Sequence, residues 1–487
     1  MPDVRAVRLD GAGPAVSGVS LSSQRIVPGD LYAGLPGSRA HGITFAADAV
    51  AAGAVALLTD DAGLDAAPGD VLDRVPVLVV PEPRRVLGRL AAHVYGEPAA
   101  AMRMIGITGT QGKTTTTRLA EGALAAAGTV AGVVGTLGTR IAGVEVKTAL
   151  TTPEAPDLHA LFAVMRERGV EACAMEVSSH ALVMGRVDGV VFDVAVFTNL
   201  GRDHLDFHTD VEDYFRAKAS LFTPGRSRLG LVNVDDEHGR RLVEQATVPV
   251  RTFSATGRAA DWRAVEVDLA PDGSTFVVVA PDGSRHPAGV PLPGAFNVAN
   301  ALAAVAACGE AGLDPARVAA GLAGGAGVPG RFERVDAGQE FAVVVDYAHK
   351  PDAVEAALRT LRPLTDGRVI VVIGAGGDRD PGKRPIMGEI AARLADLVVV
   401  TDDNPRREDP AAIRQALLAG AAAGPAEVRE VGDRRVAIRT ALEAARPGDI
   451  VLVAGKGHEA GQQVGDVVQP FDDRDVVREE LAGVVGR

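Results

Sequence analysis

Short apolar runs alternate with helical patterns in the C-terminal part of the chain, from residue 333 to residue 487. The runs contain almost no polar residues, which is typical of strands buried on both faces of a parallel sheet. The predicted strands are Ala342–Asp346, Val369–Ile373, Leu397–Thr401 and Ile450–Ala454, and the predicted helices are Asp352–Leu361, Pro385–Leu394, Pro410–Ala423 and Arg434–Ala445. The alternation predicts βαβ units, and therefore an α/β domain with a Rossmann-like sheet.

Each of these predicted strands ends in a polar loop. Along the chain the loops read DYAHKPD, GAGGDRDPGKR, DDNPRRED and GKGHE. In open α/β sheets, ligands bind outside the carboxyl ends of the strands. The loops together therefore predict a binding site at one edge of this sheet.

The preceding residues show the same alternation. Strands are predicted at Ala172–Val177, Val191–Thr198 and Leu229–Val234, and residues 1–100 hold shorter strand-like runs and a helical pattern at Arg84–Val94. A Gly-Glu-Pro segment and an alanine stretch then suit a linker. We expect three α/β domains: a smaller N-terminal domain at 1–100, a central domain with a mostly parallel, P-loop-type sheet at 101–332, and the Rossmann-like domain at 333–487.

Composition argues against several classes of protein. Fifty Lys and Arg against 63 Asp and Glu give a net charge of −13, which disfavours nucleic-acid binding. No apolar run approaches the ~18 residues of a membrane span, and the N-terminus lacks an apolar signal core. Cys173 and Cys308 are too few for a disulfide scaffold or a thiolate metal site. We expect a soluble cytoplasmic protein, and nothing in the sequence requires more than a monomer.

A glycine-rich segment follows the predicted strand that starts at Met104. It consists of Gly109, Thr110, Gln111, Gly112, Lys113, Thr114 and Thr115, and a helix is predicted at Thr115–Leu124. Glycines let backbone N–H groups approach phosphates, the lysine can reach the β- and γ-phosphate oxygens, and the next hydroxyl can hold Mg²⁺. The strict Walker spacing is absent, because Ile107 stands where that motif has glycine. A turn that only caps a helix is the alternative, but the strand–loop–helix context favours ATP binding.

Two strand ends carry candidate metal ligands. Glu176 ends one strand and His204 follows the next. Both ends should lie at the same sheet edge as the glycine-rich loop, where a carboxylate and an imidazole could hold Mg²⁺ against nucleotide phosphates. A single histidine is more often a surface or core residue, so the prediction rests on the coincidence with the phosphate loop. Lys218, in the helical stretch Asp213–Phe222, would by default be a solvated lysine.

Taken together, these motifs resemble the Mur ligases, ATP-dependent amide-bond-forming enzymes that build the peptide stem of bacterial peptidoglycan. The matching segments are GTQGKTT at 109–115, TTP at 151–153, MEVSSHAL at 175–182, NLGRDHLDFH at 199–208, LPGAFNVAN at 292–300 and DYAHKPD at 346–352. They span nearly the whole chain in the family's order. The segment DNPR at 403–406 is similar to that of the MurE-type members, which add diaminopimelate, whereas lysine-adding relatives lack its arginine.

The resemblance implies roles for individual residues. ATP would be bound by Gly109–Thr115, Asn297, Arg331 and Asp346. The UDP end of the substrate would be held by Leu21, Ser23, Ser38, Arg39 and Ala40, and its muramoyl-dipeptide by Thr151, Thr152, Ser178 and Arg186.

The catalytic set implied by the resemblance would consist of Lys113, Glu176, His204 and Lys218. The Mg²⁺ ligands would be Thr114, Glu176 and His204. Lys218 aligns with the family lysine that CO₂ carbamylates, which would turn a cation into an anionic oxygen ligand for the metal. Diaminopimelate would be held by Arg379, Asp403, Asn404, Pro405, Arg406, Gly455 and Glu459.

The sequence departs from the family pattern in places. Ser22-Ser23-Gln24 replaces the usual Asp-Ser-Arg of the uridine segment, Leu150 and Gln111 each stand where relatives have Asn, and Met184 replaces a common Gln. The uridine-segment and Leu150 departures touch substrate recognition. A specialised paralogue with an altered substrate therefore stays open.

Rival interpretations make different demands on the sequence. Arg406 disfavours a lysine-adding ligase, unless it is only a surface arginine in a turn, and the uridine-type N-terminal domain disfavours a folylpolyglutamate synthase. A P-loop motor or switch NTPase would leave the DNPR and GKGHE loops unexplained. A catalytically silent binding paralogue would not need an intact Lys113, Glu176, His204 and Lys218.

Overall fold

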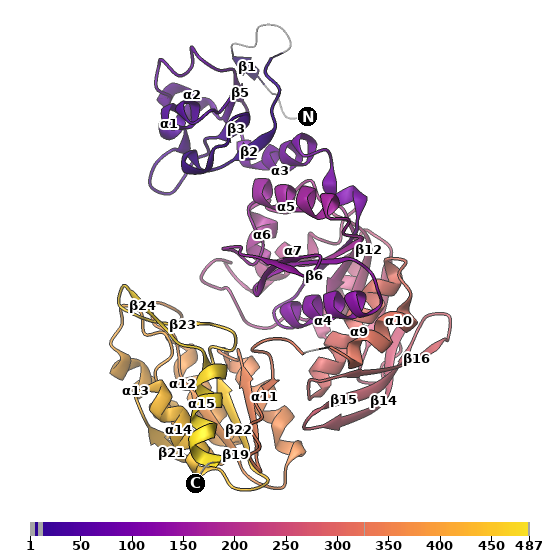
Figure 1. Cartoon of the computed structure of the whole chain (residues 1–487), viewed down its shortest axis with the longest axis vertical. Coiled ribbons are helices and arrows are strands. Elements are labelled where there is room, and N and C mark those ends of the chain that lie inside the picture. The colour runs from indigo at the N-terminus through magenta and orange to yellow at the C-terminus, as the bar shows by residue number, and fades with distance from the viewer. Residues whose placement is uncertain (1–4, 8–12, 326, 486–487) are drawn as a thin grey trace.

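The computed structural model describes residues 5–7, 13–325 and 327–485. Within these ranges the strands form a five-stranded, an eleven-stranded and a six-stranded sheet, together with a two-stranded hairpin. Figure 1 shows the large sheets in three successive lobes, from the indigo N-terminal lobe through the magenta central lobe to the orange and yellow C-terminal lobe. The three-domain α/β architecture is therefore confirmed. Its boundaries after residues 100 and 332 remain predictions.

The N-terminal domain is a small sheet with helices packed on it. Its elements are β1 (Arg5–Val7), β2 (Gly18–Ser20), η1 (Ser23–Arg25), β3 (Asp30–Ala33), η2 (Gly42–Phe45), α1 (Ala46–Ala51), β4 (Ala56–Thr59), α2 (Asp61–Ala66), β5 (Val77–Val79) and α3 (Pro83–Val94). The strand order is β1-β5-β4-β3-β2, and β2 runs parallel to β3. The loops that follow these two strands therefore leave the sheet at the same edge.

The central domain is built on the eleven-stranded sheet. Its elements are η3 (Pro98–Ala101), β6 (Arg103–Thr108), α4 (Lys113–Ala126), β7 (Ala131–Gly135), β8 (Gly138–Ile141), β9 (Val144–Val146), α5 (Ala155–Glu167), β10 (Ala172–Glu176), α6 (Ser179–Val183), β11 (Phe192–Phe197), α7 (Val211–Ala219), β12 (Ser227–Asn233), α8 (Glu237–Gln245), β13 (Val250–Ser254), β14 (Trp262–Ala270), β15 (Gly273–Val279), β16 (Arg285–Val290), α9 (Ala295–Glu310) and α10 (Pro315–Ala323). Strand β6 lies between β10 and β11 and is parallel to both. The expectation that the phosphate loop, Glu176 and the His204 segment leave one sheet edge is confirmed.

Helix α9 shows how the central core is packed. Its residues from Ala301 to Cys308 are all fully buried, and most of them are alanine. Small side chains let this helix lie close to α4 and to the sheet, so that both helices share one apolar core with β6 and β11. The N-terminus of α4 is thereby fixed beside that of α9.

The C-terminal domain contains the six-stranded sheet. Its elements are β17 (Glu333–Arg334), β18 (Ala342–Asp346), α11 (Pro351–Leu361), η4 (Arg362–Leu364), β19 (Val369–Ile373), α12 (Lys383–Leu394), β20 (Leu397–Val400), α13 (Pro410–Ala421), β21 (Glu427–Glu430), α14 (Arg434–Ala444), β22 (Ile450–Ala454), β23 (Gly461–Val464), β24 (Val467–Pro470) and α15 (Asp473–Val485). The order is β17-β18-β22-β19-β20-β21, so the four apolar strands predicted from the sequence occupy the interior. All pairs are parallel except β17–β18.

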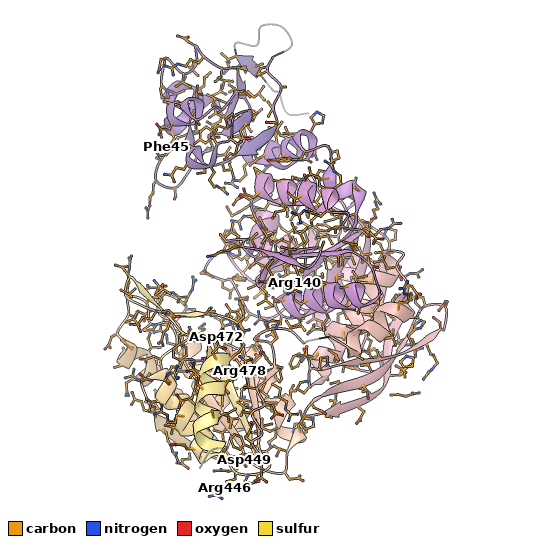
Figure 2. The ribbon with its side chains drawn as sticks, viewed as in Figure 1. Phe45, Arg140, Arg446, Asp449, Asp472 and Arg478 are labelled. Atoms are coloured by element: carbon orange, nitrogen blue, oxygen red, sulfur yellow. The ribbon has the colours of Figure 1, made fainter. Side chains whose placement is uncertain are left out.

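The direction of these strands sets where their loops lie. Arg446 and Asp449, which precede β22, lie at the end of the domain farthest from the central lobe, whereas Asp472 lies at the end nearest to it (Figure 2). The carboxyl ends of the strands therefore face the central domain.

The described part of the chain holds no helix that is long and apolar enough to cross a membrane. Both cysteines are buried and unpaired. Burial raises the pKa of the Cys173 and Cys308 thiols to about 12, so both remain protonated at neutral pH.

Candidate active site

A cavity of about 630 Å³ is lined by the central and C-terminal domains. Loops after β6, β10 and β11 and the start of α9 form its central-domain side, and the loop after β18 forms the other side. The predicted residues that line it are Thr110, Gln111, Gly112, Lys113, Thr114, Thr115, Thr151, Thr152, Glu176, Ser178, Arg186, His204, Lys218, Asn297, Arg331 and Asp346. The structure thus brings together the residues expected to bind ATP, the metal and the muramoyl-dipeptide.

The glycines of the phosphate loop are required by its geometry. Gly109 has a φ of 149° and Gly112 a φ of 84°, values that residues with a side chain rarely adopt. A Cβ on Gly109 would lie 1.9 Å from Oγ1 of Thr198, and one on Gly112 would lie 2.3 Å from Oδ1 of Asn300. The loop therefore packs directly on the β11 end and on α9, and α4 begins at Lys113 with its N-terminus toward the cavity.

Lys113 is folded back over its own loop. Its Nζ donates to the carbonyl oxygens of Gly109, at 2.8 Å, and Thr110, at 3.1 Å. Burial lowers the pKa of Lys113 to about 8. An anion such as a phosphate would favour the charged form and take over these hydrogen bonds.

Lys218 is fully enclosed, so the interpretation as a solvated lysine is wrong. The residue is 1% exposed, and its Nζ donates to the Gly109 carbonyl at 2.9 Å and lies 4.5 Å from the centre of the Tyr214 ring. Burial lowers its pKa well below the ordinary lysine value, with the charge of Lys113 acting in the same direction. A neutral amine is the form of lysine that reacts with CO₂.

Glu176, at the end of β10, and His204, in the loop after β11, line the same cavity from the two strands on either side of β6. The Glu176 carboxylate is 1% exposed and accepts from Thr136, at 2.8 Å from the backbone N–H and 3.1 Å from the hydroxyl. His204 packs edge-on against His180, with ring centroids 4.8 Å apart. Burial lowers the pKa of His204 to about 4, so its imidazole is neutral near pH 7.

The predicted magnesium ligands are of types that suit the ion, and they line the same cavity. No group of three or more His, Cys, Asp and Glu side chains converges within the described ranges. The predicted set instead combines one carboxylate and one neutral imidazole with the Thr114 hydroxyl and Lys218, all on one cavity wall. Mg²⁺ commonly takes few protein ligands and completes its shell with phosphate oxygens and water. The residues present suit such a site.

Arg331 and Asp346 belong to the connection between the two domains. The Arg331 guanidinium lies 4.3 Å from the centre of the Tyr347 ring, and its Nη2 donates to Oγ1 of Thr114 at 3.5 Å. Asp346 accepts from the backbone N–H groups of Phe332, at 2.9 Å, and Ala348, at 2.8 Å. Burial raises the pKa of Asp346, while nearby Arg331 opposes this shift.

The residues expected to hold the dipeptide also line the cavity. Thr152 donates to the Glu176 carbonyl at 2.9 Å, and Ser178 caps α6 by accepting from Ala181. Arg186 is held by Glu154, with Nε 2.9 Å from the carboxylate. The guanidinium group of Arg186 and the hydroxyl groups of the Thr and Ser residues therefore line the cavity, and such groups suit an anionic, hydroxyl-rich ligand.

The residues expected to bind UDP lie elsewhere. Leu21 and Ser23 follow β2, and Ser38, Arg39 and Ala40 follow β3 in an exposed loop. They share one edge of the N-terminal sheet and do not line the cavity. The structure therefore separates the expected UDP site from the cavity, as a long nucleotide-sugar substrate would require.

A second group of predicted residues gathers at the carboxyl ends of β19, β20 and β22. The Arg406 guanidinium donates to the Gly377 carbonyl at 2.6 Å, and the Asn404 amide donates to Glu459 at 2.8 Å. Both predicted arginines lie close to Gly376. A Cβ built on this glycine would lie 2.9 Å from Nη1 of Arg406 and 3.9 Å from Cγ of Arg379.

The remaining members of this group are held by close backbone packing. A Cβ on Gly455 would lie 2.5 Å from Oδ2 of Asp403, and one on Gly377 would lie 1.9 Å from the Pro405 carbonyl oxygen. The loops therefore interlock, and we name the group (Arg379, Asp403–Arg406, Gly455 and Glu459) the C-terminal pocket.

Comparison with known proteins follows the same division of the chain. Residues 15–95 match the model of the Mur ligase family catalytic domain, 107–308 that of the Mur ligase middle domain, and 330–457 that of the Mur ligase glutamate ligase domain. The chain is 57% identical to UDP-N-acetylmuramoyl-L-alanyl-D-glutamate--2,6-diaminopimelate ligase of Streptomyces avermitilis, over 97% of this chain and 93% of the relative.

The chain belongs to the Mur ligase family. The protein of the same name from Streptomyces coelicolor is 56% identical over 100% of this chain and 96% of its own. A solved structure of UDP-N-acetylmuramoyl-L-alanyl-D-glutamate--2,6-diaminopimelate ligase matches this Mur ligase with a TM-score of 0.70 and 33% identity, covering 96% of this chain and 95% of the other. Both sequence and fold thus place the chain among the Mur ligases.

Sequence reasoning missed several charged or polar residues of this Mur ligase. Lys456 is fully buried, and its Nζ donates to Oδ1 of Asn404 at 3.0 Å and lies 3.4 Å from Oε2 of Glu459. Since the Gln463 N–H also donates to Oδ1 of Asn404, the amide nitrogen is the atom that faces Glu459. The GKGHE loop was singled out as a whole, but its lysine was not.

His349 and Lys350 in the DYAHKPD loop were missed in the same way. Both line the cavity. Nδ1 of His349 lies 2.7 Å from the Tyr347 carbonyl oxygen, and burial lowers the pKa of His349 to about 3. Nδ1 therefore carries the proton of a neutral imidazole. The scarcity of lysine in the whole sequence is a signal that could have drawn attention to Lys350 and Lys456.

Proposed function

We propose that this Mur ligase joins diaminopimelate to the D-glutamyl γ-carboxylate of UDP-N-acetylmuramoyl-L-alanyl-D-glutamate, with conversion of ATP to ADP and phosphate. One observation carries the proposal: a phosphate loop and dipeptide-facing groups share a cavity whose other wall is the domain that holds the C-terminal pocket. The names of the relatives support the choice of substrates. Such precursor synthesis would take place in the cytoplasm.

ATP binding follows from the phosphate loop. The α4 N-terminus and the loop N–H groups offer positive potential to the phosphates. Lys113 would release the Gly109 and Thr110 carbonyls and donate to the phosphates instead. Asn297, Arg331 and Asp346 would contact the nucleotide at the boundary between the domains.

The reaction requires activation of a carboxylate, because oxide is a poor leaving group. The γ-carboxylate oxygen attacks the γ-phosphorus of ATP, the bond to ADP breaks, and an acyl phosphate forms. The neutral amine of diaminopimelate then attacks the acyl carbon, and a proton leaves its nitrogen for phosphate or water. The carbon–oxygen bond to the phosphoryl group breaks, and inorganic phosphate leaves with that electron pair. Lys113 and Arg331 would offset the negative charge during both steps.

Glu176, His204 and Thr114 would hold Mg²⁺, with Lys218 as a carbamate. When bound, the ion would neutralise phosphate charge and orient the oxygens of the nucleotide. The burial of Lys218, which lowers the pKa of its amine, supports carbamylation, because addition of CO₂ needs an unprotonated nitrogen. The carbamate would replace the hydrogen bond that Nζ makes to Gly109.

The C-terminal pocket suits the distal end of diaminopimelate, which carries both a carboxylate and an ammonium group. Arg406 would bind the carboxylate through two parallel hydrogen bonds. Glu459, aligned by Asn404, would bind the ammonium group. Lysine lacks the carboxylate, so Arg406 would be left without a partner.

Phosphate release tests this proposal directly. The enzyme is supplied with Mg²⁺, ATP and UDP-N-acetylmuramoyl-L-alanyl-D-glutamate, and with diaminopimelate, lysine or no amino acid in parallel. We expect release only with diaminopimelate and its loss in Lys113→Met. Equal release with lysine would refute the assignment of the pocket, and release without any amino acid would indicate an NTPase.

A further inference from the structure

Lysine is scarce in this chain, and four of its six lysines lie in the two sites described above. Six of the 50 basic residues are lysines: Lys113, Lys147, Lys218, Lys350, Lys383 and Lys456. Lys147 is exposed, and the other five are buried or half-buried. Arginine otherwise supplies the positive charge, although it cannot replace a compact ammonium group in a confined space. A lysine retained in the interior therefore marks a position where that compact group matters.

Lys350 is the one among these that reaches from one domain into the other. It precedes α11 in the C-terminal domain, and its Nζ forms a hydrogen-bonded ion pair with Oδ2 of Asp203, in the central-domain loop between β11 and α7. The side chains are only 22% and 11% exposed. Partial burial weakens screening by solvent, so this pair is stronger than an ordinary surface pair.

Asp203 connects the ion pair to His204. Its Oδ1 accepts from the His204 backbone N–H at 2.9 Å, and its Oδ2 lies 3.1 Å from Nε2 of the His204 ring. His204 has a φ of 53°, a left-handed conformation that is uncommon for residues with a side chain. Asp203 is therefore one of the groups that fix both the backbone and the ring of His204.

The same loop is also packed closely against α11. A Cβ on Gly201 would lie 2.9 Å from Oδ2 of Asp352, in the first turn of that helix. The Gly201 N–H in turn donates to the Thr110 hydroxyl of the phosphate loop at 2.9 Å. The loop that carries His204 is thus held between the phosphate loop on one side and the C-terminal domain on the other.

We propose that Lys350 is a positioning residue, which the C-terminal domain inserts into the cavity so that its ion pair with Asp203 holds the His204 loop against the phosphate loop. This inference rests on the proposed ligase function, since His204 is assigned there to the metal. Lys350 is not among the residues expected to bind any of the three substrates. Loss of Lys350 should therefore slow turnover far more than it weakens the binding of any one substrate.

The kinetic test uses the full-length enzyme and Lys350→Met, with Lys147→Met as the matched control. We expect kcat for diaminopimelate-dependent phosphate release to fall at least about 10-fold, with KM for each substrate changed less than about 3-fold. Lys350→Arg should recover part of kcat, because it keeps the charge. An unchanged kcat in Lys350→Met, or an equal loss in Lys147→Met, would overturn the proposal.

A double-mutant cycle tests the route of the effect. If Lys350 acts through Asp203, then Lys350→Met should add little to the loss already caused by Asp203→Asn. If the fold-losses in kcat of the two single variants multiply in the double variant, Lys350 acts independently of Asp203, and this would contradict the inference.

A measurement without substrates separates this inference from the proposed function. Donor and acceptor dyes on Val164→Cys in α5 and Val436→Cys in α14 report the arrangement of the two domains, and both native cysteines are buried. We expect Lys350→Met to change the energy transfer and Lys147→Met to leave it unchanged. Identical transfer in both variants would overturn the inference. If wild-type enzyme failed to use diaminopimelate while Lys350→Met still changed the transfer, the proposed function alone would fail.

Discussion

The cavity and the C-terminal pocket both lie at the carboxyl ends of parallel strands, but they are assembled differently. The cavity takes its walls from two domains, whereas the pocket uses loops of a single sheet. In the cavity, burial moves the pKa of Lys113, Lys218 and His204 away from their ordinary values. In the pocket, the polar groups are held by hydrogen bonds among themselves, as Asn404 is by Lys456.

The difference shows how this fold separates recognition from chemistry. A pocket within one domain keeps its shape whatever the other domains do. A cavity shared by two domains is complete only when they are together, which protects a reactive acyl phosphate from water. Perturbations of the pocket should therefore change the affinity for one substrate, and perturbations of the cavity should change turnover or ATP binding.

The largest expected effect is in the pocket. Arg406→Ala should raise KM for diaminopimelate by about 100-fold, because a charge-assisted bidentate contact is lost, while the affinity for ATP stays the same. Steady-state kinetics and ATP titration measure the two effects. Arg406 has a φ of 51°, so Arg406→Gly serves as a control that relieves backbone strain and should lose diaminopimelate equally. Recovery of KM in the glycine variant would show that the backbone matters and the guanidinium does not.

A smaller effect is expected beneath the same pocket. Lys456→Met removes the donor that fixes the Asn404 amide, and we expect KM for diaminopimelate to rise about 10-fold, the cost of about one charged hydrogen bond. Calorimetric titration with ATP should be unchanged. Weakened ATP binding in this variant would mean that the pocket and the cavity are coupled, contrary to the comparison.

A third prediction concerns the cavity: ATP binding should depend on pH through the protonation of Lys113. The pKa of Lys113 is lowered to about 8, so its ammonium form is complete below that pH and is lost above it. ATP affinity should fall roughly 5-fold between pH 7.5 and pH 9, with proton uptake on binding. Titration calorimetry in buffers of different ionisation enthalpy measures both. Lys113→Arg remains charged, and a persisting pH dependence in it would point to another group.

The smallest effect is expected far from both sites. Arg25 and Asp157 join the N-terminal and central domains through contacts of 3.1 and 3.2 Å, but their side chains are 59% and 42% exposed. Solvent screens such a pair, so Arg25→Ala should lower the melting temperature by less than about 2 °C. A drop several times larger, observed by calorimetry, would show that this surface contact contributes as much as a buried one.

The strands of the C-terminal sheet were predictable because they are buried on both faces. Ala342–Asp346, Val369–Ile373 and Ile450–Ala454 occur at the expected residues. Helix starts were less accurate: α7 begins at Val211 and not Asp213, because Asp210 caps it by accepting from the Asp213 N–H. An alternating or exposed strand leaves a weaker pattern, as β14 and β16 do. The apolar run Phe276–Ala280, most of which lies in β15, was present in the sequence but was not used.

The motifs identified most of the cavity residues, since a phosphate loop and its neighbouring strand ends are local patterns. The order β18-β22-β19-β20 was not accessible, because parallel pairing joins segments far apart in the chain. The contact of Lys456 with Asn404 spans 52 residues for the same reason. Only the folded arrangement shows that the Lys456 ammonium group and the Gln463 N–H donate to the same amide oxygen of Asn404.

The backbone of Arg406, in the loop after β20, is hydrogen-bonded to the hairpin β23–β24. Its backbone N–H donates to Gln463 at 3.0 Å, and its carbonyl accepts from the Gly465 N–H at 2.6 Å. Under the proposed function, the choice of amino acid would depend on the loop after β20 and on this hairpin, and neither segment contributes a residue to the apolar clusters of the described part of the domain. A change of amino-acid specificity would then require changes in these two segments only, whereas a change in the nucleotide site would involve residues of two domains.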